Sequence, residues 1–228
     1  MTAQHDRSII DFGELARRWS AGQDGLRLVP VPLAPEIRLH LAADDIVLWA
    51  RMEAEAGIAL PAPFWASAWL GGQALARFVL DHPNVVTGRR VLDLAAGSGV
   101  AGIAASLAGA AMVTANDIDP YAVAAIEANA KVNSVEITVS CATMLDEDAD
   151  VDLVLVGDVF YSKSIAETAL PALERASARG ARILVGDPGR ADLPLGRLEI
   201  VATYPVAHVA AVVDAEVEWV HVLQLPSL

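Results

Sequence analysis

From residue 63 onward, short apolar runs alternate with amphipathic stretches. The runs at residues 90–94, 151–156 and 182–185 are apolar apart from isolated charged residues, as expected of strands that helices cover on both faces. The pattern predicts strands at 90–94, 111–116, 135–140, 151–156, 182–185, 198–204 and 217–225, and helices at 70–80, 100–107, 120–133 and 164–178. This alternation indicates an α/β fold with a doubly wound, mainly parallel sheet. The last two strands have no helical pattern between them and predict a closing hairpin with an antiparallel strand, which gives a seven-stranded sheet.

The first 60 residues lack this regular alternation. The sequence predicts an amphipathic helix at residues 8–19, a half-buried strand at 37–41 and a helix at 44–56, with prolines at 30, 32 and 35 marking an irregular segment. We therefore expect a helical N-terminal extension, residues 1–60, that packs on a domain spanning residues 61–228.

Residues 94–115 contain no charged side chain, and such a run is long enough to cross a bilayer. The run is rich in alanine, however, and it begins with the turn glycines Gly97 and Gly99. Asp93 and Asp117 flank it. A buried strand, turn, helix and second strand fits these residues better, so we expect no membrane association.

The composition narrows the classes of function. The 228 residues include 16 Lys and Arg against 29 Asp and Glu, and the net charge of −13 argues against a nucleic-acid partner. The 54% hydrophobic content excludes disorder. One cysteine, Cys141, excludes an intrachain disulfide, and the five scattered histidines show no metal-binding spacing. The first 20 residues lack the apolar core of a signal peptide. We expect a cytoplasmic monomer without a metal.

A glycine loop follows the first regular strand. Residues 97–102 satisfy G-x-G-x-x-G, and Asp117 follows Gly97 by 20 positions. Glycines let the backbone approach a ligand, and an acid at the end of the next strand accepts ribose hydroxyls. This pattern alone is compatible with an NAD(P)-dependent oxidoreductase.

Asp93 favours a different ligand. A carboxylate before the loop weakens pyrophosphate binding at the helix N-terminus, whereas it attracts the α-ammonium and sulfonium groups of S-adenosylmethionine. The alternative is that Asp93 only organises the loop backbone.

The motifs resemble those of a known superfamily. VLDLAAGSG resembles motif I of class I S-adenosylmethionine-dependent methyltransferases, and residues 116–120, NDIDP, are similar to the segment that ends their second strand. The resemblance implies that Asp117 holds the ribose, that Ile118 lies beside the adenine and that Thr143 contacts the adenine edge. The cofactor-binding residues that it implies are Trp69, Asp93, Gly97, Ser98, Gly99, Asp117, Ile118, Thr143 and Gly157.

The strand at 151–156 ends in GDVFY, residues 157–161, and not in the Asn/Asp-Pro-Pro-Tyr of amino-group methylation on bases or glutamine. Its Asp-x-x-Tyr resembles the seven-strand protein lysine methyltransferases. Residues 63–75, 116–120 and 186–190 resemble the lysine methyltransferases that act on the electron transfer flavoprotein β-subunit. The ribosomal protein L11 methyltransferases share a similar glycine loop and are the alternative within the class.

Methylation of lysine requires that the site accept an ammonium group, let a proton leave and align the nitrogen lone pair. Asp158 could hydrogen-bond the amine and stabilise the developing charge, while Phe160 and Tyr161 could line the lysine channel. The alternative role for Asp158 is a helix cap, and the alternative for Phe160 and Tyr161 is core packing.

Three further residues are assigned to the substrate side of the site: Trp65, Asp187 and Arg190. The alternative for Trp65 is core packing, and the alternative for Asp187 and Arg190 is a simple turn. A cofactor-binding scaffold without activity is the remaining hypothesis.

Overall fold

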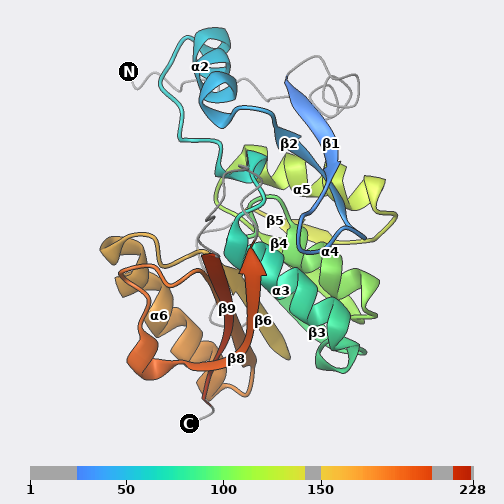
Figure 1. The fold of residues 1–228 in the computed structure, drawn as a ribbon, viewed down its shortest axis with the longest axis vertical. Coiled ribbons are helices and arrows are strands. Elements are labelled where there is room, and N and C mark those ends of the chain that lie inside the picture. The colour runs from blue at the N-terminus through green and yellow to red at the C-terminus, as the bar shows by residue number, and fades with distance from the viewer. Residues whose placement is uncertain (1–24, 142–149, 207–217, 227–228) are drawn as a thin grey trace, which may run out of the picture.

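In the computed structural model, which describes residues 25–141, 150–206 and 218–226, a mainly parallel sheet forms the centre of the protein (Figure 1). Its seven strands lie in the order β5-β4-β3-β6-β7-β9-β8. They are β3 (Arg90–Leu94), β4 (Met112–Asn116), β5 (Thr138–Ser140), β6 (Leu153–Gly157), β7 (Arg182–Asp187), β8 (Glu199–Val206) and β9 (Glu218–Leu225). β9 pairs antiparallel with β7 and β8, and the other neighbouring pairs are parallel. The predicted sheet with its closing antiparallel strand is confirmed.

Helices cover both faces of the sheet because successive side chains of a strand point to opposite faces. The helices are α2 (Asp45–Ala56), α3 (Leu70–Asp81), α4 (Val100–Leu107), α5 (Pro120–Val132) and α6 (Lys163–Ala178), and the short 3₁₀ turns are η1 (Phe64–Ala66), η2 (Pro83–Val85) and η3 (Leu195–Arg197). Leu153 and Leu155 of β6 pack in one core cluster with residues of α3 and α4. Val154 and Val156 pack in another cluster with residues of α6. This double coverage explains the continuous apolar runs.

The uncharged run at residues 94–115 lies inside this architecture. It comprises the end of β3, the glycine loop, α4 and most of β4, as predicted. Among the residues that the structure describes, no helix is long and apolar enough to cross a membrane.

β5 is shorter than the predicted strand at 135–140. Ser134 adopts a left-handed conformation with φ 56°, and the backbone N–H of Val135 donates back to Ala130 O at 3.1 Å. These residues therefore close the end of α5, and pairing with β4 begins only at Thr138.

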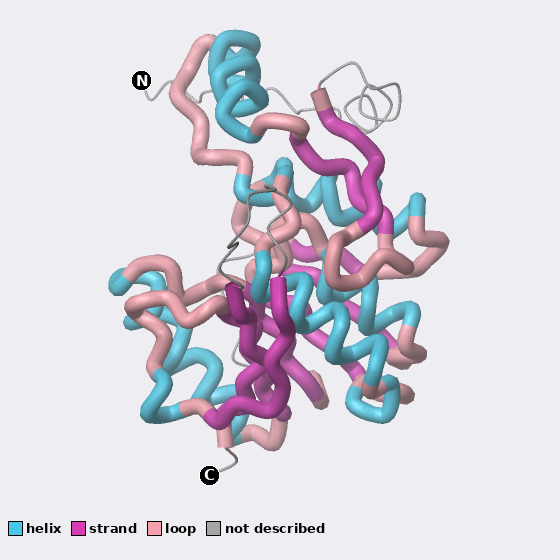
Figure 2. The backbone as a smooth tube through the Cα atoms, in the orientation of Figure 1, coloured by secondary structure: helices cyan, strands magenta, loops and turns pink. Residues whose placement is uncertain are grey.

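The described part of the N-terminal extension contains the predicted strand, as β2 (Arg38–Ala42), and the predicted helix, as α2, together with one strand that the sequence did not predict. β1 (Leu26–Pro30) and β2 form an antiparallel hairpin ahead of α2 (Figure 2). β1 was missed because Pro30 reads as a strand breaker, yet it is the last residue of an edge strand, a position where proline is tolerated. The predicted helix at 8–19 lies outside the described residues.

Two asparagines, Asn129 within α5 and Asn133 at its C-terminal cap, hold the hairpin. Asn133 Oδ1 accepts from the backbone N–H of Arg38 at 2.9 Å, and its Nδ2 donates to Arg38 O at 2.7 Å. The fully buried Asn129 accepts from His40 N at 2.8 Å and donates from Nδ2 to Ser98 O at 2.9 Å. A single side chain thus joins the hairpin to the glycine loop.

The first turn of α3 lies unusually close to the ends of β6 and β7. A Cβ atom on Gly71 would lie 2.0 Å from Gly186 O, and one on Gly157 would lie 2.7 Å from Gly72 N. Backbone atoms cannot yield at such distances, so only glycine fits on each side of this contact. The contact fixes where the N-terminus of α3 meets the sheet.

We predict that Gly186→Ala lowers the free energy of unfolding by about 3 kcal/mol, because a methyl group would overlap Gly71 O. Urea unfolding measures the change. Gly196→Ala is the matched control, since a Cβ there meets nothing within 4 Å, and its effect should stay within about 0.5 kcal/mol. Equal stabilities of the two variants would contradict the close contact.

Candidate active site

The glycine loop turns between β3 and α4 through three left-handed residues. Ala95 and Gly97 have φ 53° and Gly99 has φ 79°. Asp117, just after β4, orients this loop: its Oδ2 accepts from the Gly97 N–H at 2.9 Å and its Oδ1 accepts from the Asp119 N–H at 3.0 Å. The acid therefore faces the loop, as the sequence predicts.

Asp93 is almost fully buried beneath the same loop. Its Oδ2 accepts from the Gly102 N–H in the first turn of α4 at 2.7 Å. Burial raises the pKa of Asp93 to about 7, and the nearby charge of Asp117 acts in the same direction. Asp93 both organises the backbone and places a titratable acid below the loop, so the two interpretations of this residue are compatible.

The other residues assigned to the cofactor lie in different settings. Ile118, two residues after the end of β4, is 68% exposed. Ser98 is buried and presents its carbonyl to Asn129. Gly157 belongs to the close contact with α3. Thr143 lies outside the described residues.

Asp158 lies at the carboxyl end of β6 and makes two different contacts. Its Oδ1 binds Nη2 of Arg190 at 2.8 Å, and its Oδ2 accepts from the Gly72 N–H at 3.1 Å. Gly72 is the third residue of α3, so Asp158 also caps this helix from another element. Its own backbone is left-handed, with φ 56°, and its N–H donates to Gly186 O at 2.8 Å. Burial raises the pKa of Asp158, and Arg190 opposes this shift.

Three half-exposed aromatic rings contact one another, and one of them, Trp69, lies against Arg190. The Phe64 ring lies 5.9 Å from the Trp69 ring and 5.7 Å from the Tyr161 ring, between centroids. Trp69 Nε1 donates to Phe64 O at 2.8 Å, and Arg190 Cζ lies 5.8 Å from the Trp69 ring centroid. Burial, together with the charge of Asp117, raises the pKa of Tyr161. We call Phe64, Trp69 and Tyr161 the aromatic cluster.

Two residues assigned to the site are buried in the core, where neither side chain faces a channel or a surface. Phe160 is fully buried in the cluster with α6, so it does not line a channel, because the chain turns after β6 and presents only Tyr161 outward. Trp65 is also buried, its ring stacked on Tyr121 of α5 at 6.5 Å, and it does not border a substrate. Each of the two residues packs in the core, as its alternative interpretation held.

Phe64 was not assigned to the site from the sequence. It is 50% exposed and adjoins the buried Trp65 in η1, so the sequence offered two neighbouring aromatic residues without showing which one faces outward. The position of η1 is informative: Trp65 Cα lies 3.9 Å from where a Cβ on Gly97 would stand. The backbone of η1 is therefore next to the glycine loop.

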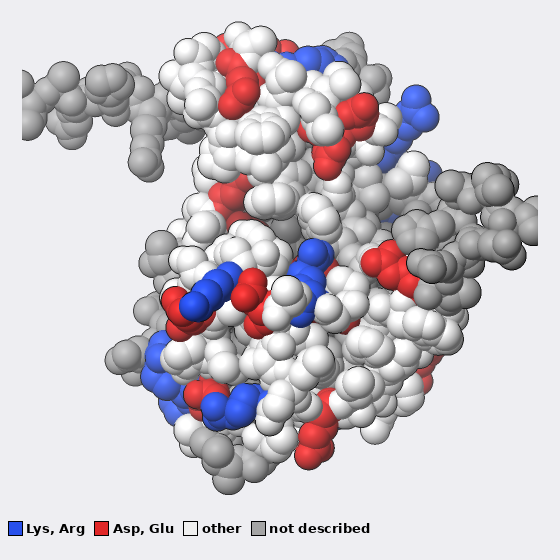
Figure 3. All heavy atoms as spheres, turned by 60° about the vertical axis from the view of Figure 1, so that its left-hand side comes forward, with Lys and Arg blue, Asp and Glu red and all other residues white. Residues whose placement is uncertain are grey.

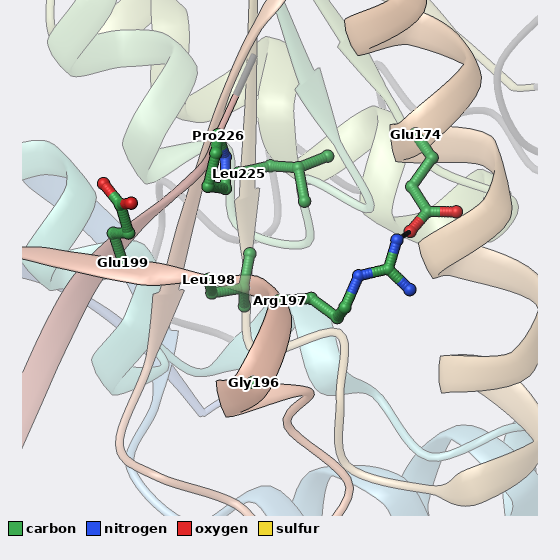
Figure 4. A pocket seen from close by; sticks show the side chains of 7 residues that line it. All are labelled: Glu174, Gly196, Arg197, Leu198, Glu199, Leu225 and Pro226. Atoms are coloured by element: carbon green, nitrogen blue, oxygen red, sulfur yellow. Dashed lines mark hydrogen bonds and ion pairs between the residues drawn. The ribbon is translucent and has the colours of Figure 1, made fainter. Parts of the chain in front are cut away.

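The site lies where parallel strands end, as ligand sites in such sheets do. On the face drawn in Figure 3, most Lys and Arg side chains adjoin Asp or Glu, and neither charge gathers in an extended patch. A separate hollow lies at the opposite edge, where β8 begins and β9 ends (Figure 4). Its lining includes the Arg197–Glu174 ion pair, and it shares no residue with the site.

The sheet order, the glycine loop after β3 and the acid after β4 define a Rossmann-like class I S-adenosylmethionine-dependent methyltransferase. The family model for ribosomal protein L11 methyltransferase (PrmA) matches residues 73–179. The crystal structure of ribosomal protein L11 methylase from Lactobacillus delbrueckii subsp. bulgaricus has the same fold. It superposes with a TM-score of 0.50 at 22% identity, over 68% of this chain and 77% of that chain.

Sequence relatives define the family more narrowly. The electron transfer flavoprotein beta subunit lysine methyltransferase of Xenopus laevis is 39% identical over 183 residues, which cover 77% of this chain and 74% of that protein. The Danio rerio protein of the same name is 42% identical over 163 residues, 70% of this chain. The chain therefore belongs to the family of electron transfer flavoprotein beta subunit lysine methyltransferases. It spans 62% of the length of the Danio rerio relative.

We predict that Asp93 makes stability fall with rising pH. Its pKa is about 7 in the folded state and about 4 in the unfolded chain. Between these values the folded state binds more protons, so the contribution is full below pH about 4 and lost as pH rises to about 7, an effect of about 4 kcal/mol. Chemical unfolding across this pH range should show that the free energy of unfolding of Asp93→Asn increases relative to that of the wild type as pH rises. Parallel curves would contradict the raised pKa.

Proposed function

We propose that this protein transfers methyl groups from S-adenosylmethionine to lysine side chains of the electron transfer flavoprotein β-subunit. The observation that carries the proposal is the buried acid Asp158 at the end of β6, beside half-exposed aromatic rings and one strand away from the glycine loop. Membership of the family supports the choice of substrate.

The residues of the loop fit the cofactor. The Asp117 oxygens face the loop and each accepts one backbone N–H, which leaves lone pairs for two ribose hydroxyls. Asp93 is an acid whose burial disfavours its charge, and a cationic ligand above it would offset that cost. Ile118 offers an exposed apolar surface for the adenine. When bound, the cofactor supplies a methyl group on a sulfonium, which the lysine nitrogen takes from sulfur.

The chain's own residues prepare the lysine. At pH 7 only about one lysine side chain in two thousand is neutral, because its pKa is about 10.4. The aromatic cluster removes water around the amine and so favours the loss of its proton to solvent. Asp158 then holds the remaining N–H and stabilises the positive charge that returns to nitrogen as it gains the methyl group.

A second candidate substrate is ribosomal protein L11. The match of the L11 methyltransferase family model over residues 73–179 favours it. Both candidates are lysine-bearing proteins and would use the same residues, so purified substrates must separate them.

The cofactor prediction concerns Asp117. Isothermal titration should show that S-adenosylhomocysteine binds and that NAD does not. Asp117→Asn should raise the dissociation constant about tenfold to a hundredfold, because a charged hydrogen bond contributes about 1.5–3 kcal/mol. Glu174→Gln, in the remote hollow of Figure 4, is the control and should bind normally. Binding of NAD without S-adenosylhomocysteine would overturn the proposal.

The substrate prediction uses labelled cofactor with each purified protein. We expect label on lysines of the flavoprotein β-subunit, identified by mass spectrometry. Asp158→Asn should lower kcat about a hundredfold, while its binding of S-adenosylhomocysteine is retained. Label only on ribosomal protein L11 would favour the second candidate. Unchanged turnover in the variant would remove Asp158 from the reaction, and a wild type that labels neither protein would support a scaffold without activity.

A further inference from the structure

In this structure Asp158 is ion-paired with a cationic side chain of the same protein, Arg190. The guanidinium of Arg190 lies between the Asp158 carboxylate, at 2.8 Å, and the face of the Trp69 ring, at 5.8 Å from its centroid. The Asp158 side chain is 10% exposed and the Arg190 side chain 27% exposed. An ammonium group that enters along the aromatic cluster would reach the same carboxylate.

A rigid turn delivers Arg190 to this place. The fully buried Asp187 accepts from the backbone N–H groups of Gly189 and Arg190, both at 2.7 Å through Oδ1. Gly189 has φ 91°, which lets the chain reverse after β7. The turn thereby fixes the backbone of Arg190, and its long side chain reaches from there to Asp158.

The hydrogen bonding of Arg190 is incomplete. Its Nε and the Oδ2 of Asp187 are buried, 3.9 Å apart, and neither has a hydrogen-bond partner among the described residues. Buried polar atoms are nearly always paired in proteins, so an unpaired donor and acceptor here call for an explanation. Movement of Arg190 into solvent would relieve the unpaired donor. Arg190 is thus held by a short ion pair to Asp158 and a longer one to Asp187, and its Nε would gain a hydrogen bond from water on leaving.

We propose that Arg190 occupies the ammonium subsite formed by Asp158 and the aromatic cluster, and that the substrate lysine displaces it on binding. The inference rests on the proposed function. One carboxylate oxygen is already engaged by the Gly72 N–H, and two cations on the other oxygen would repel each other. The planar guanidinium matches the Trp69 face, and once it leaves, the half-exposed rings can contact the lysine alkyl chain.

The alternative is that Arg190 stays in place and only orients Asp158. The two roles predict opposite kinetics. If Arg190 competes with the substrate, its removal lowers KM for the protein substrate. If it positions Asp158, its removal raises KM or lowers kcat alone.

Steady-state methylation of the purified β-subunit should distinguish them. We expect Arg190→Gln to lower KM about tenfold, which corresponds to about 1.4 kcal/mol. Arg190→Lys keeps a cation and should resemble the wild type. Arg197→Gln is the matched control, because Arg197 is ion-paired with Glu174 at the opposite edge of the sheet, and its KM should not change. An unchanged or higher KM in Arg190→Gln would overturn the proposal.

The pH profile gives a second measure. The charged groups that face Asp158 are Arg190 and Asp187, and only Arg190 favours the ionised acid. In Arg190→Gln the acid limb of kcat/KM should therefore move to higher pH, whereas a limb that stays in place would show that Arg190 does not act on Asp158. Should Arg190→Gln fail to fold, Arg190→Met, which keeps the apolar stem, makes the same comparison.

A binding experiment separates this inference from the proposed function. n-Butylammonium, titrated in the presence of S-adenosylhomocysteine, should bind about tenfold more tightly to Arg190→Gln than to the wild type, and not to Arg190→Gln/Asp158→Asn. If the wild type methylates the β-subunit but the probe gains no affinity, the displacement is wrong and the function stands. If the probe gains affinity but neither protein substrate is methylated, the subsite stands and the proposed function fails.

Discussion

The contact between the first turn of α3 and the ends of β6 and β7 decides where the site can form. Glycine backbones meet there at distances that no side chain could accept. The contact brings Trp69, which precedes α3, beside Asp158, which follows β6. The Gly72 N–H and the Asp158 carboxylate then close the junction. A carboxylate at this point stabilises the helix, and in the proposed reaction the same group also holds the substrate amine.

Buried acids dominate the electrostatics of the edge at which the parallel strands end. Asp93, Asp158 and Asp187 are all nearly or fully buried. Each accepts a hydrogen bond from at least one backbone N–H group, which favours the ionised form and opposes the effect of burial. Such an edge attracts cations. Both ligands of the proposed reaction are cationic. The Arg190 guanidinium is attracted by two of the same acids, Asp158 and Asp187.

The sequence predicted the sheet closely because strands covered on both faces leave long apolar runs between the amphipathic helices. The loop acids could be placed too, since the ends of β3 and β4 lie side by side. Neighbouring aromatic residues could not be sorted: Phe160 and Tyr161 differ only in which way the chain turns after β6, and Trp65 and Phe64 differ by their position in a single 3₁₀ turn. The contacts of Arg190 depend on a turn geometry that no spacing reveals. The cytoplasmic location and the monomeric state stay predictions.

Asn129 has a consequence for how the molecule is divided. Its amide spans from the N-terminal hairpin to the glycine loop, and Val31, Ile37 and Leu39 lie in the same core cluster as residues of α3 and α4. The hairpin therefore shares one core with the rest of the sheet domain. Without the hairpin, a buried amide and an apolar face would be stranded beside the cofactor loop. Because the hairpin and the glycine loop share these contacts, a substitution in one limits the substitutions that the other can tolerate.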